Sequence, residues 1–228
     1  KGFERSTGLR MSQVAAEVLP GRPVGVLTGP NLAREILEGR SAATVIAATD
    51  PAAASALQGL LASDRFRVYT NEDLVGCELG GALKNVIALA AGMAEGLDTG
   101  DNARAALITR GLAEMTRLGV ALGGDPMTFA GLAGMGDVMA TCMSSQSRNR
   151  WVGEQVGRGA APDRVLAGMD QVAEGVRTAT VACELAASVA MEVPVAEGVR
   201  SVFDDGRSPT EVWSALMARR TGPEVATT

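Results

Sequence analysis

Histidine is absent from the 228 residues, and cysteine and aromatic residues are scarce. Without histidine, the chain lacks the usual imidazole acid–base group and the commonest metal ligand. Its three cysteines, Cys77, Cys142 and Cys183, form neither a C-x-x-C pair nor an even set. The sequence therefore predicts no metal site and no disulfide framework, and it indicates a reduced, cytoplasmic setting.

Clusters of positive charge are also absent, and the formal net charge is −5. This balance argues against nucleic acid or an anionic membrane as the main partner. No apolar segment free of glycine and charge is long enough for a membrane span, and the first residues show no signal-peptide pattern. The chain starts with Lys1 rather than methionine, which suggests a piece of a longer protein.

The sequence pattern changes near residue 71. Before it, β-branched runs alternate with helical segments, which predicts α/β structure, and after it the apolar period of 3.6 predicts helices. We expect two domains, residues 1–71 and 72–228. The strands are expected at Val24–Thr28, Thr44–Thr49 and Phe66–Thr70, and the helices at Met11–Leu19, Asn31–Leu37, Pro51–Leu61, Glu78–Glu95, Leu107–Leu122, Trp151–Gly157, Gly175–Ala190, Ala196–Phe203 and Pro209–Arg219.

Lys84 is the only charged residue between Glu78 and Glu95 in a glycine-rich apolar helix. Such isolation predicts partial desolvation, which lowers a lysine pKa from about 10.4 toward values useful for proton transfer. The alternative is a surface lysine whose stem lies along the core. On a helical wheel Lys84 shares its face with small residues that leave room for a ligand, namely Cys77, Gly80, Gly81, Ala88 and Ala91.

Two glycine-containing segments are further candidates. Leu27–Ala33 passes from a strand into a helix, where α/β proteins often bind ligands, although Asn31 could simply cap the helix. Gly131–Asp137 follows no strand, so we do not interpret its glycines as a dinucleotide fingerprint. We expect a loop that brings Asp137 to a pocket, or else Asp137 as the cap of the next helix.

Ser147-Arg148-Asn149-Arg150 opens a predicted helix after a polar stretch. A hydroxyl, a guanidinium and an amide at a helix N-terminus suit a phosphate group, while the alternative is a solvated, capped helix start. Glu174 could accept hydrogen bonds from a ribose or an amide, or it could only complement a helix dipole.

Together these segments resemble the bacterial type of NAD(P)-dependent glycerol-3-phosphate dehydrogenase. The similarity runs in order from Lys1 to about Arg219, and it includes Gly29-Pro-Asn-Leu-Ala33, Gly80-Gly-Ala-Leu-Lys-Asn-Val86, Asn102-Ala-Arg-Ala-Ala-Leu-Ile-Thr-Arg-Gly-Leu112, Gly134-Met-Gly-Asp137, Ser147–Arg150 and Val172-Ala-Glu-Gly175.

The resemblance implies the C-terminal portion of a Rossmann-type domain followed by a multi-helix catalytic domain. It implies interconversion of dihydroxyacetone phosphate and sn-glycerol 3-phosphate with NAD(P)H, which supplies phospholipid synthesis, and Lys84 as the proton donor and acceptor. The implied substrate-binding residues, besides Lys84, are Lys1, Gly29, Asn31, Asp137, Ser147, Arg148 and Asn149. The implied cofactor-binding residues are Lys1, Ala33, Arg148, Val172 and Glu174.

The sequence departs from the family pattern in two respects. Position 31 often carries a small hydroxyl residue in relatives, and the amino-terminal half of the nucleotide domain, with its G-x-G-x-x-G turn, is not in this chain. Two alternatives stay open: a related β-hydroxyacid dehydrogenase that acts on an unphosphorylated substrate, and a non-catalytic helical fragment that forms a homodimer.

Overall fold

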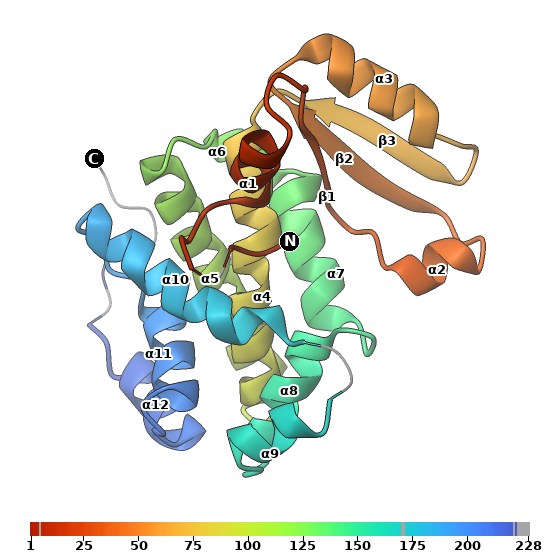
Figure 1. Ribbon diagram of the computed structural model, residues 1–228. Coiled ribbons are helices and arrows are strands. Elements are labelled where there is room, and N and C mark those ends of the chain that lie inside the picture. Colours follow the sequence, from red (N-terminus) through yellow and green to blue (C-terminus); the bar gives the residue numbers. More distant parts are fainter. Residues whose placement is uncertain (5, 170–171, 221, 223–228) are drawn as a thin grey trace.

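The computed structural model describes residues 1–4, 6–169, 172–220 and 222, in which a small sheet adjoins one end of a helical domain (Figure 1). The elements are, in order, α1 (Met11–Val18), β1 (Gly25–Thr28), α2 (Ala33–Leu37), β2 (Ala42–Ala48), α3 (Pro51–Leu61), β3 (Phe66–Asn71), α4 (Leu74–Gly96), α5 (Asp101–Ala121), α6 (Pro126–Ala130), the π-helical turn η1 (Leu132–Gly136), α7 (Asp137–Met143), α8 (Arg148–Gly157), α9 (Pro162–Ala167), α10 (Glu174–Ser188), α11 (Pro194–Phe203) and α12 (Pro209–Met217).

The three strands within the described residues have the order β1-β2-β3. The central strand β2 pairs in parallel with β3 but antiparallel with β1. A doubly wound sheet is largely parallel, so the β1 pairing differs from the simplest expectation for such a domain. The segment between these two strands contains only α2, which has five residues, none of them buried. An antiparallel pair needs no helix that crosses the face of the sheet.

Helix α3 makes the longer connection between β2 and β3. Asp50 caps it by accepting a hydrogen bond from the Ala52 backbone, and Pro51 occupies the first turn, as the sequence predicts. The predicted capping box at Ser208 is also present, at the start of α12. Every predicted helix and strand is found, with its ends displaced by about a turn or less, except that α4 and α5 begin earlier than predicted.

Helix α4 is the centre of the helical domain and is surrounded by α5, α7, α8, α10 and α11 (Figure 1). Every residue from Leu79 to Ala94 is buried, including Lys84, whose exposed fraction is 7%. The alternative of a surface lysine is therefore wrong. By length and composition α4 could cross a membrane, but 83% of its most apolar window is buried inside the protein, as in the core helix of a folded domain.

Helices α4 and α8 touch backbone to backbone along a glycine seam, formed by Gly92 and Gly96 on α4 and Gly153 and Gly157 on α8. A Cβ atom on Gly92 would lie 2.0 Å from the Arg150 carbonyl oxygen. A Cβ atom on Gly153 would lie 2.1 Å from the Leu89 carbonyl oxygen. These distances are far below van der Waals contact, so larger residues would force the helices apart.

Segment Gly131–Asp137 is not the loop that the sequence predicts. It forms η1 and continues directly into α7. Its glycines permit close packing, because a Cβ on Gly134 would lie 2.1 Å from the Phe129 carbonyl oxygen. Asp137 does not cap α7 either, since no side-chain capping bond is made there.

Candidate functional site

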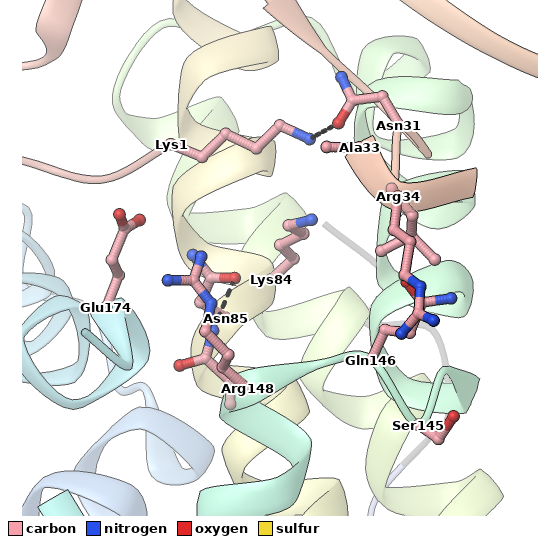
Figure 2. Close-up of a pocket in the computed structure, with 12 residues that line it drawn as sticks. Lys1, Asn31, Ala33, Arg34, Lys84, Asn85, Ser145, Gln146, Arg148 and Glu174 are labelled. Carbon is pink, nitrogen blue, oxygen red and sulfur yellow. Dashed lines mark hydrogen bonds between the residues drawn. The ribbon is translucent and has the colours of Figure 1, made fainter. Parts of the chain in front are cut away.

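A cavity of about 900 Å³ lies between the sheet and the helical domain (Figure 2). Its walls come from the segment after β1, the middle of α4, the turn before α8, the start of α8 and the start of α10. This volume is within the usual range for small-molecule sites. The lining residues are Lys1, Asn31, Leu32, Ala33, Arg34, Lys84, Asn85, Ser145, Gln146, Arg148, Asn149 and Glu174.

One carboxylate links two lysines at the inner wall of the cavity. Asp137, at the start of α7, pairs with Lys84 through Oδ1 and with Lys1 through Oδ2, the latter at 2.7 Å. The Asp137 side chain is only 3% exposed, so the charges interact with little solvent between them. Residues far apart in the sequence thus form one ionic cluster, which we term the Lys–Asp–Lys cluster.

Lys84 is held by two hydrogen bonds. Its Nζ atom donates to Asp137 and, over 2.8 Å, to the Thr141 hydroxyl one turn further along α7. The Thr141 hydroxyl in turn donates to the Asp137 carbonyl oxygen at 2.6 Å. An ammonium group has three N–H bonds, so one remains available toward the cavity that Lys84 lines.

Lys1 joins the sheet to the Lys–Asp–Lys cluster. Its Nζ atom also donates to the Gly29 carbonyl oxygen at 2.8 Å and to Asn31 Oδ1 at 2.9 Å, as Figure 2 shows for Asn31. Burial lowers the pKa of Lys1 to about 8; the nearby Lys84 charge adds to this effect and Asp137 opposes it. The left-handed φ of +101° at Gly29 allows the chain to turn at this point.

The start of α8 forms another wall of the cavity. Ser147 caps the helix by accepting a hydrogen bond from the Arg150 backbone at 3.2 Å, so the capped helix start that the sequence left open as the alternative to a phosphate site is present. Arg148 donates to the Val172 carbonyl oxygen at 3.1 Å, which connects α8 to the segment before α10. Asn149 is buried between Asn85 on α4 and the Gly175 backbone, at 3.1 and 2.9 Å.

The structure brings most of the predicted site residues to the cavity. Lys1, Asn31, Ala33, Lys84, Arg148, Asn149 and Glu174 line it. Three others bond to these residues: Gly29 and Asp137 accept hydrogen bonds from the lysines, and Val172 accepts one from Arg148. A fourth, Ser147, caps α8 through the Arg150 backbone. None of these four lines the cavity itself.

Sequence reasoning missed several residues of the site. Ser145 and Gln146, in the polar stretch before α8, line the cavity. The polarity of that stretch is the pattern from which they could have been predicted. Asn85 follows Lys84 directly and holds Asn149. Thr141 lies one helical turn after Asp137, on the same face of α7, which is the spacing that would have identified it. The remaining missed residues of the lining are Leu32 and Arg34.

The lining of the cavity carries more positive than negative side chains: Lys1, Arg34, Lys84 and Arg148 against Glu174. Asp137 behind the lining pairs with both lysines, and Glu38 pairs with Arg34, so Arg148 is the cation of the lining for which no carboxylate partner is described. Cysteine chemistry has no part here, because burial raises the pKa of Cys77 and of Cys142 to about 12 and both thiols stay protonated near neutral pH. Such a site suits an anionic ligand and an acid–base group of the ammonium type.

Comparisons with known proteins agree on one family. The chain matches the family models for the N-terminus, over residues 1–54, and the C-terminus, over residues 73–214, of NAD-dependent glycerol-3-phosphate dehydrogenase. Glycerol-3-phosphate dehydrogenase 2 (NAD(P)+) of Sphingopyxis alaskensis is 54% identical over 98% of the chain and 67% of that protein. Glycerol-3-phosphate dehydrogenase (NAD(P)+) of Mycobacterium avium is 51% identical over 99% of the chain and 66% of that protein.

Solved structures give the same result. Glycerol-3-phosphate dehydrogenase from Coxiella burnetii has a TM-score of 0.91 at 37% identity, over 96% of this chain and 67% of that one. DsGPDH of Dunaliella salina has a TM-score of 0.83 at 26% identity, over 93% and 38%. The chain thus spans about two thirds of the length of its curated relatives. Since these relatives are about half identical to it over nearly its whole length, the chain belongs to the NAD-dependent glycerol-3-phosphate dehydrogenase family.

Proposed function

We propose that this protein interconverts dihydroxyacetone phosphate and sn-glycerol 3-phosphate with NAD(P)H, and that Lys84 is its proton donor and acceptor. The observation that carries the proposal is the placement of Lys84: a buried ammonium, fixed by Asp137 and Thr141, at the wall of a cationic cavity. Membership of the family supports the same reaction and argues against a non-catalytic helical fragment.

The charge of the cavity favours a phosphorylated substrate. Four cationic side chains line it with one carboxylate, and the buried Asp137 behind the lining is shared between two of them. An unphosphorylated β-hydroxyacid would bring a single negative charge, whereas a phosphate monoester brings close to two and several acceptor oxygens. We assign the phosphate group to the start of α8, where the Arg148 guanidinium and the helix N-terminus both favour negative charge.

The donor set also fits a nicotinamide dinucleotide. Ala33, Arg148 and Glu174 line the same cavity, and Arg148 donates a hydrogen bond to the Val172 carbonyl group. Positive side chains suit the pyrophosphate, and a carboxylate suits ribose hydroxyls or an amide. When bound, NAD(P)H would supply the hydride for the carbonyl carbon.

Lys84 would act on the carbonyl oxygen. Its remaining N–H bond can donate to this oxygen while Asp137 and Thr141 hold the ammonium in place. As negative charge develops on the oxygen, the Nζ proton passes to it, and the alcohol product is formed. In the reverse direction the neutral amine of Lys84 accepts the hydroxyl proton.

Asp137 and Lys1 would set the electrostatics of this step. The Asp137 carboxylate keeps Lys84 oriented, and the second ammonium, Lys1, adds positive potential on the same side of the cavity. Fixed charges of this kind stabilise a developing oxyanion without reorganising during the reaction. The proposed roles of Gly29 and Asn31 are to hold Lys1 in position.

The wider context follows from the reaction. We propose a cytoplasmic enzyme that supplies glycerol 3-phosphate for phospholipid synthesis, with residues 1–71 as part of the dinucleotide-binding domain and residues 72–228 as the catalytic domain. The buried α4, rather than a membrane span, is consistent with this setting. A homodimer remains part of the proposal.

Substitution of Lys84 tests the proposed function in the full-length enzyme. Lys84→Ala should lower kcat by about 10²-fold or more, because proton transfer and oxyanion stabilisation are both lost, while the Kd for NADH changes little. Lys84→Arg should also be slow, because guanidinium does not release its proton near neutral pH. Steady-state kinetics and calorimetric NADH titration measure both quantities. A Lys84→Ala enzyme with nearly normal kcat would refute the assignment.

A further inference from the structure

Arg150 is the fourth residue of the Ser147–Arg150 segment, and nothing in the proposed function uses its side chain. It lies in the first turn of α8, and the side chain is only 14% exposed. Unlike Arg148, it does not line the cavity. A nearly buried guanidinium beside a ligand site needs partners, and its partners show what it holds.

Arg150 forms hydrogen bonds with both ends of the turn between α7 and α8, through its side chain at one end and its backbone at the other. Its Nε atom donates to the Ser144 carbonyl oxygen at 3.2 Å, where α7 ends. Its backbone N–H donates to the Ser147 hydroxyl, where α8 begins. Ser144 also accepts from the Ser147 backbone at 3.1 Å, which closes the turn. Between these anchors lie Ser145 and Gln146, which line the cavity.

The same guanidinium ties this turn to α4. Its terminal nitrogen pairs with Glu95 at the end of α4 and lies 3.4 Å from Glu154 on α8. The glycine seam keeps the two helices in backbone contact at this level, since the Arg150 carbonyl oxygen faces Gly92. Arg150 therefore connects the turn before α8 to the rigid helix that carries Lys84.

We propose that Arg150 is a positioning residue that sets the phosphate-binding start of α8 relative to Lys84. This inference rests on the proposed function, because it takes the α8 start as the phosphate site. Without the guanidinium, the Ser144–Ser147 turn loses its link to Glu95, and Arg148 no longer faces the cavity in a fixed position. Phosphate binding would weaken while the reacting centre at Lys84 stays intact.

The test uses the full-length enzyme with Arg150→Met and Arg150→Lys. Lysine keeps the charge opposite Glu95, but it cannot bond Ser144 and Glu95 through one planar group. We expect the KM for dihydroxyacetone phosphate and the Ki of inorganic phosphate to rise by about tenfold in Arg150→Met and by less in Arg150→Lys. The kcat, and the kcat/KM for unphosphorylated dihydroxyacetone, should change by less than about threefold. If Arg150→Met fails to fold, Arg150→Lys alone decides.

Arg104→Met is the matched control. Arg104 on α5 pairs with the same Glu95 at 3.4 Å and with Asp101 at 2.7 Å, and none of its bonds described in the structure reaches the turn. Its KM and Ki should stay near the wild-type values. Equal effects of Arg104→Met and Arg150→Met, or equal losses for dihydroxyacetone and its phosphate, would overturn the inference.

Arg148→Ala separates this inference from the proposed function. If Arg148→Ala weakens phosphate binding selectively but neither Arg150 variant does, the inference alone fails. If Arg148→Ala affects both ketones alike, Arg148 does not select for the phosphate group. The assignment of the phosphate to the start of α8 then fails and the inference with it, whereas the proposed reaction is decided separately by the Lys84 variants.

Discussion

At the residue scale, the central feature is one carboxylate that forms ion pairs with two ammonium groups. Asp137 bonds Lys84 and Lys1 with different oxygens, so neither lysine is left as an isolated buried charge. Burial nevertheless raises the cost of protonating Lys1, and the nearby Lys84 charge adds to it. The pKa of Lys1, about 8, lies close enough to neutrality to be visible in enzyme kinetics.

A pH profile tests this titration. Below pH 8 Lys1 is charged and adds positive potential to the site; as the pH rises through about 8 the proton and this potential are lost. We therefore expect kcat/KM for dihydroxyacetone phosphate to fall above pH 8 in the wild type. Lys1→Arg stays protonated and should keep a flatter profile between pH 7 and 9, since the guanidinium pKa is above about 12.

Lys1→Met supplies the control for this profile. Its kcat/KM should be low already at pH 7, and the part of the fall above pH 8 that is due to Lys1 should be missing. If kcat/KM falls equally above pH 8 in the wild type and in Lys1→Arg, the group that titrates is not Lys1.

At the scale of elements, a buried glutamate joins two helices. Glu114 on α5 accepts hydrogen bonds from the Val195 and Ala196 backbones, at 2.8 and 3.0 Å, and so satisfies the start of α11. Burial nevertheless raises the pKa of Glu114 to about 7, against the lowering effect of these two bonds. The contact between α5 and α11 thus depends on a carboxyl group that titrates near neutral pH.

The sign of the resulting pH effect follows from proton binding. Between about pH 4.5 and 7 the folded state holds the Glu114 proton and the unfolded state releases it. The contribution of Glu114 is therefore fully present below the unfolded pKa and is lost as the pH rises through about 7. Its upper limit is about 3 kcal/mol.

Urea unfolding at pH 5 and pH 8 measures this contribution. Other groups titrate equally in the wild type and in Glu114→Gln, so the difference between the two proteins isolates Glu114. We expect the wild type to lose more unfolding free energy than Glu114→Gln from pH 5 to pH 8. The same loss in both proteins would show that Glu114 does not titrate in this range.

At the scale of the whole molecule, burial is uneven. The large hydrophobic core is built around α4, while the sheet contributes two smaller clusters within the described residues. Leu27 on β1 and Leu37 on α2 are exposed. Local opening is easiest where few apolar contacts are lost, so the two parts should differ in local stability.

Native-state hydrogen exchange followed by mass spectrometry tests this difference. Amides of α4 between Ala88 and Ala91 should exchange only through global unfolding, because their side chains are almost completely buried. Amides of α2 and β1 should exchange faster and with little dependence on low urea concentrations. Equal protection of β1 and α4 would mean that the sheet and the helical domain unfold as one unit.

The sequence by itself determined the local structure and the family. The change of period near residue 71, the caps at Asp50 and Ser208 and the isolation of Lys84 are local patterns, and local patterns report on backbone propensity and burial. Motif order from Lys1 to Arg219 indicated the family, which the comparisons confirm.

Tertiary structure alone decided which residues meet. Lys1, Lys84 and Asp137 are distant in sequence, and their shared ion pairs arise because α7 and β1 both pack on α4, and Lys1 bonds to Gly29 just after β1. The sequence predicts a loop at η1, but its glycines allow close packing. The need for glycine there becomes visible only when the neighbouring residue is known. The antiparallel pairing of β1 and the anchoring of Arg150 to Ser144 and Glu95 have the same origin. Spacing along the chain cannot show such contacts, because they depend on how separate elements pack.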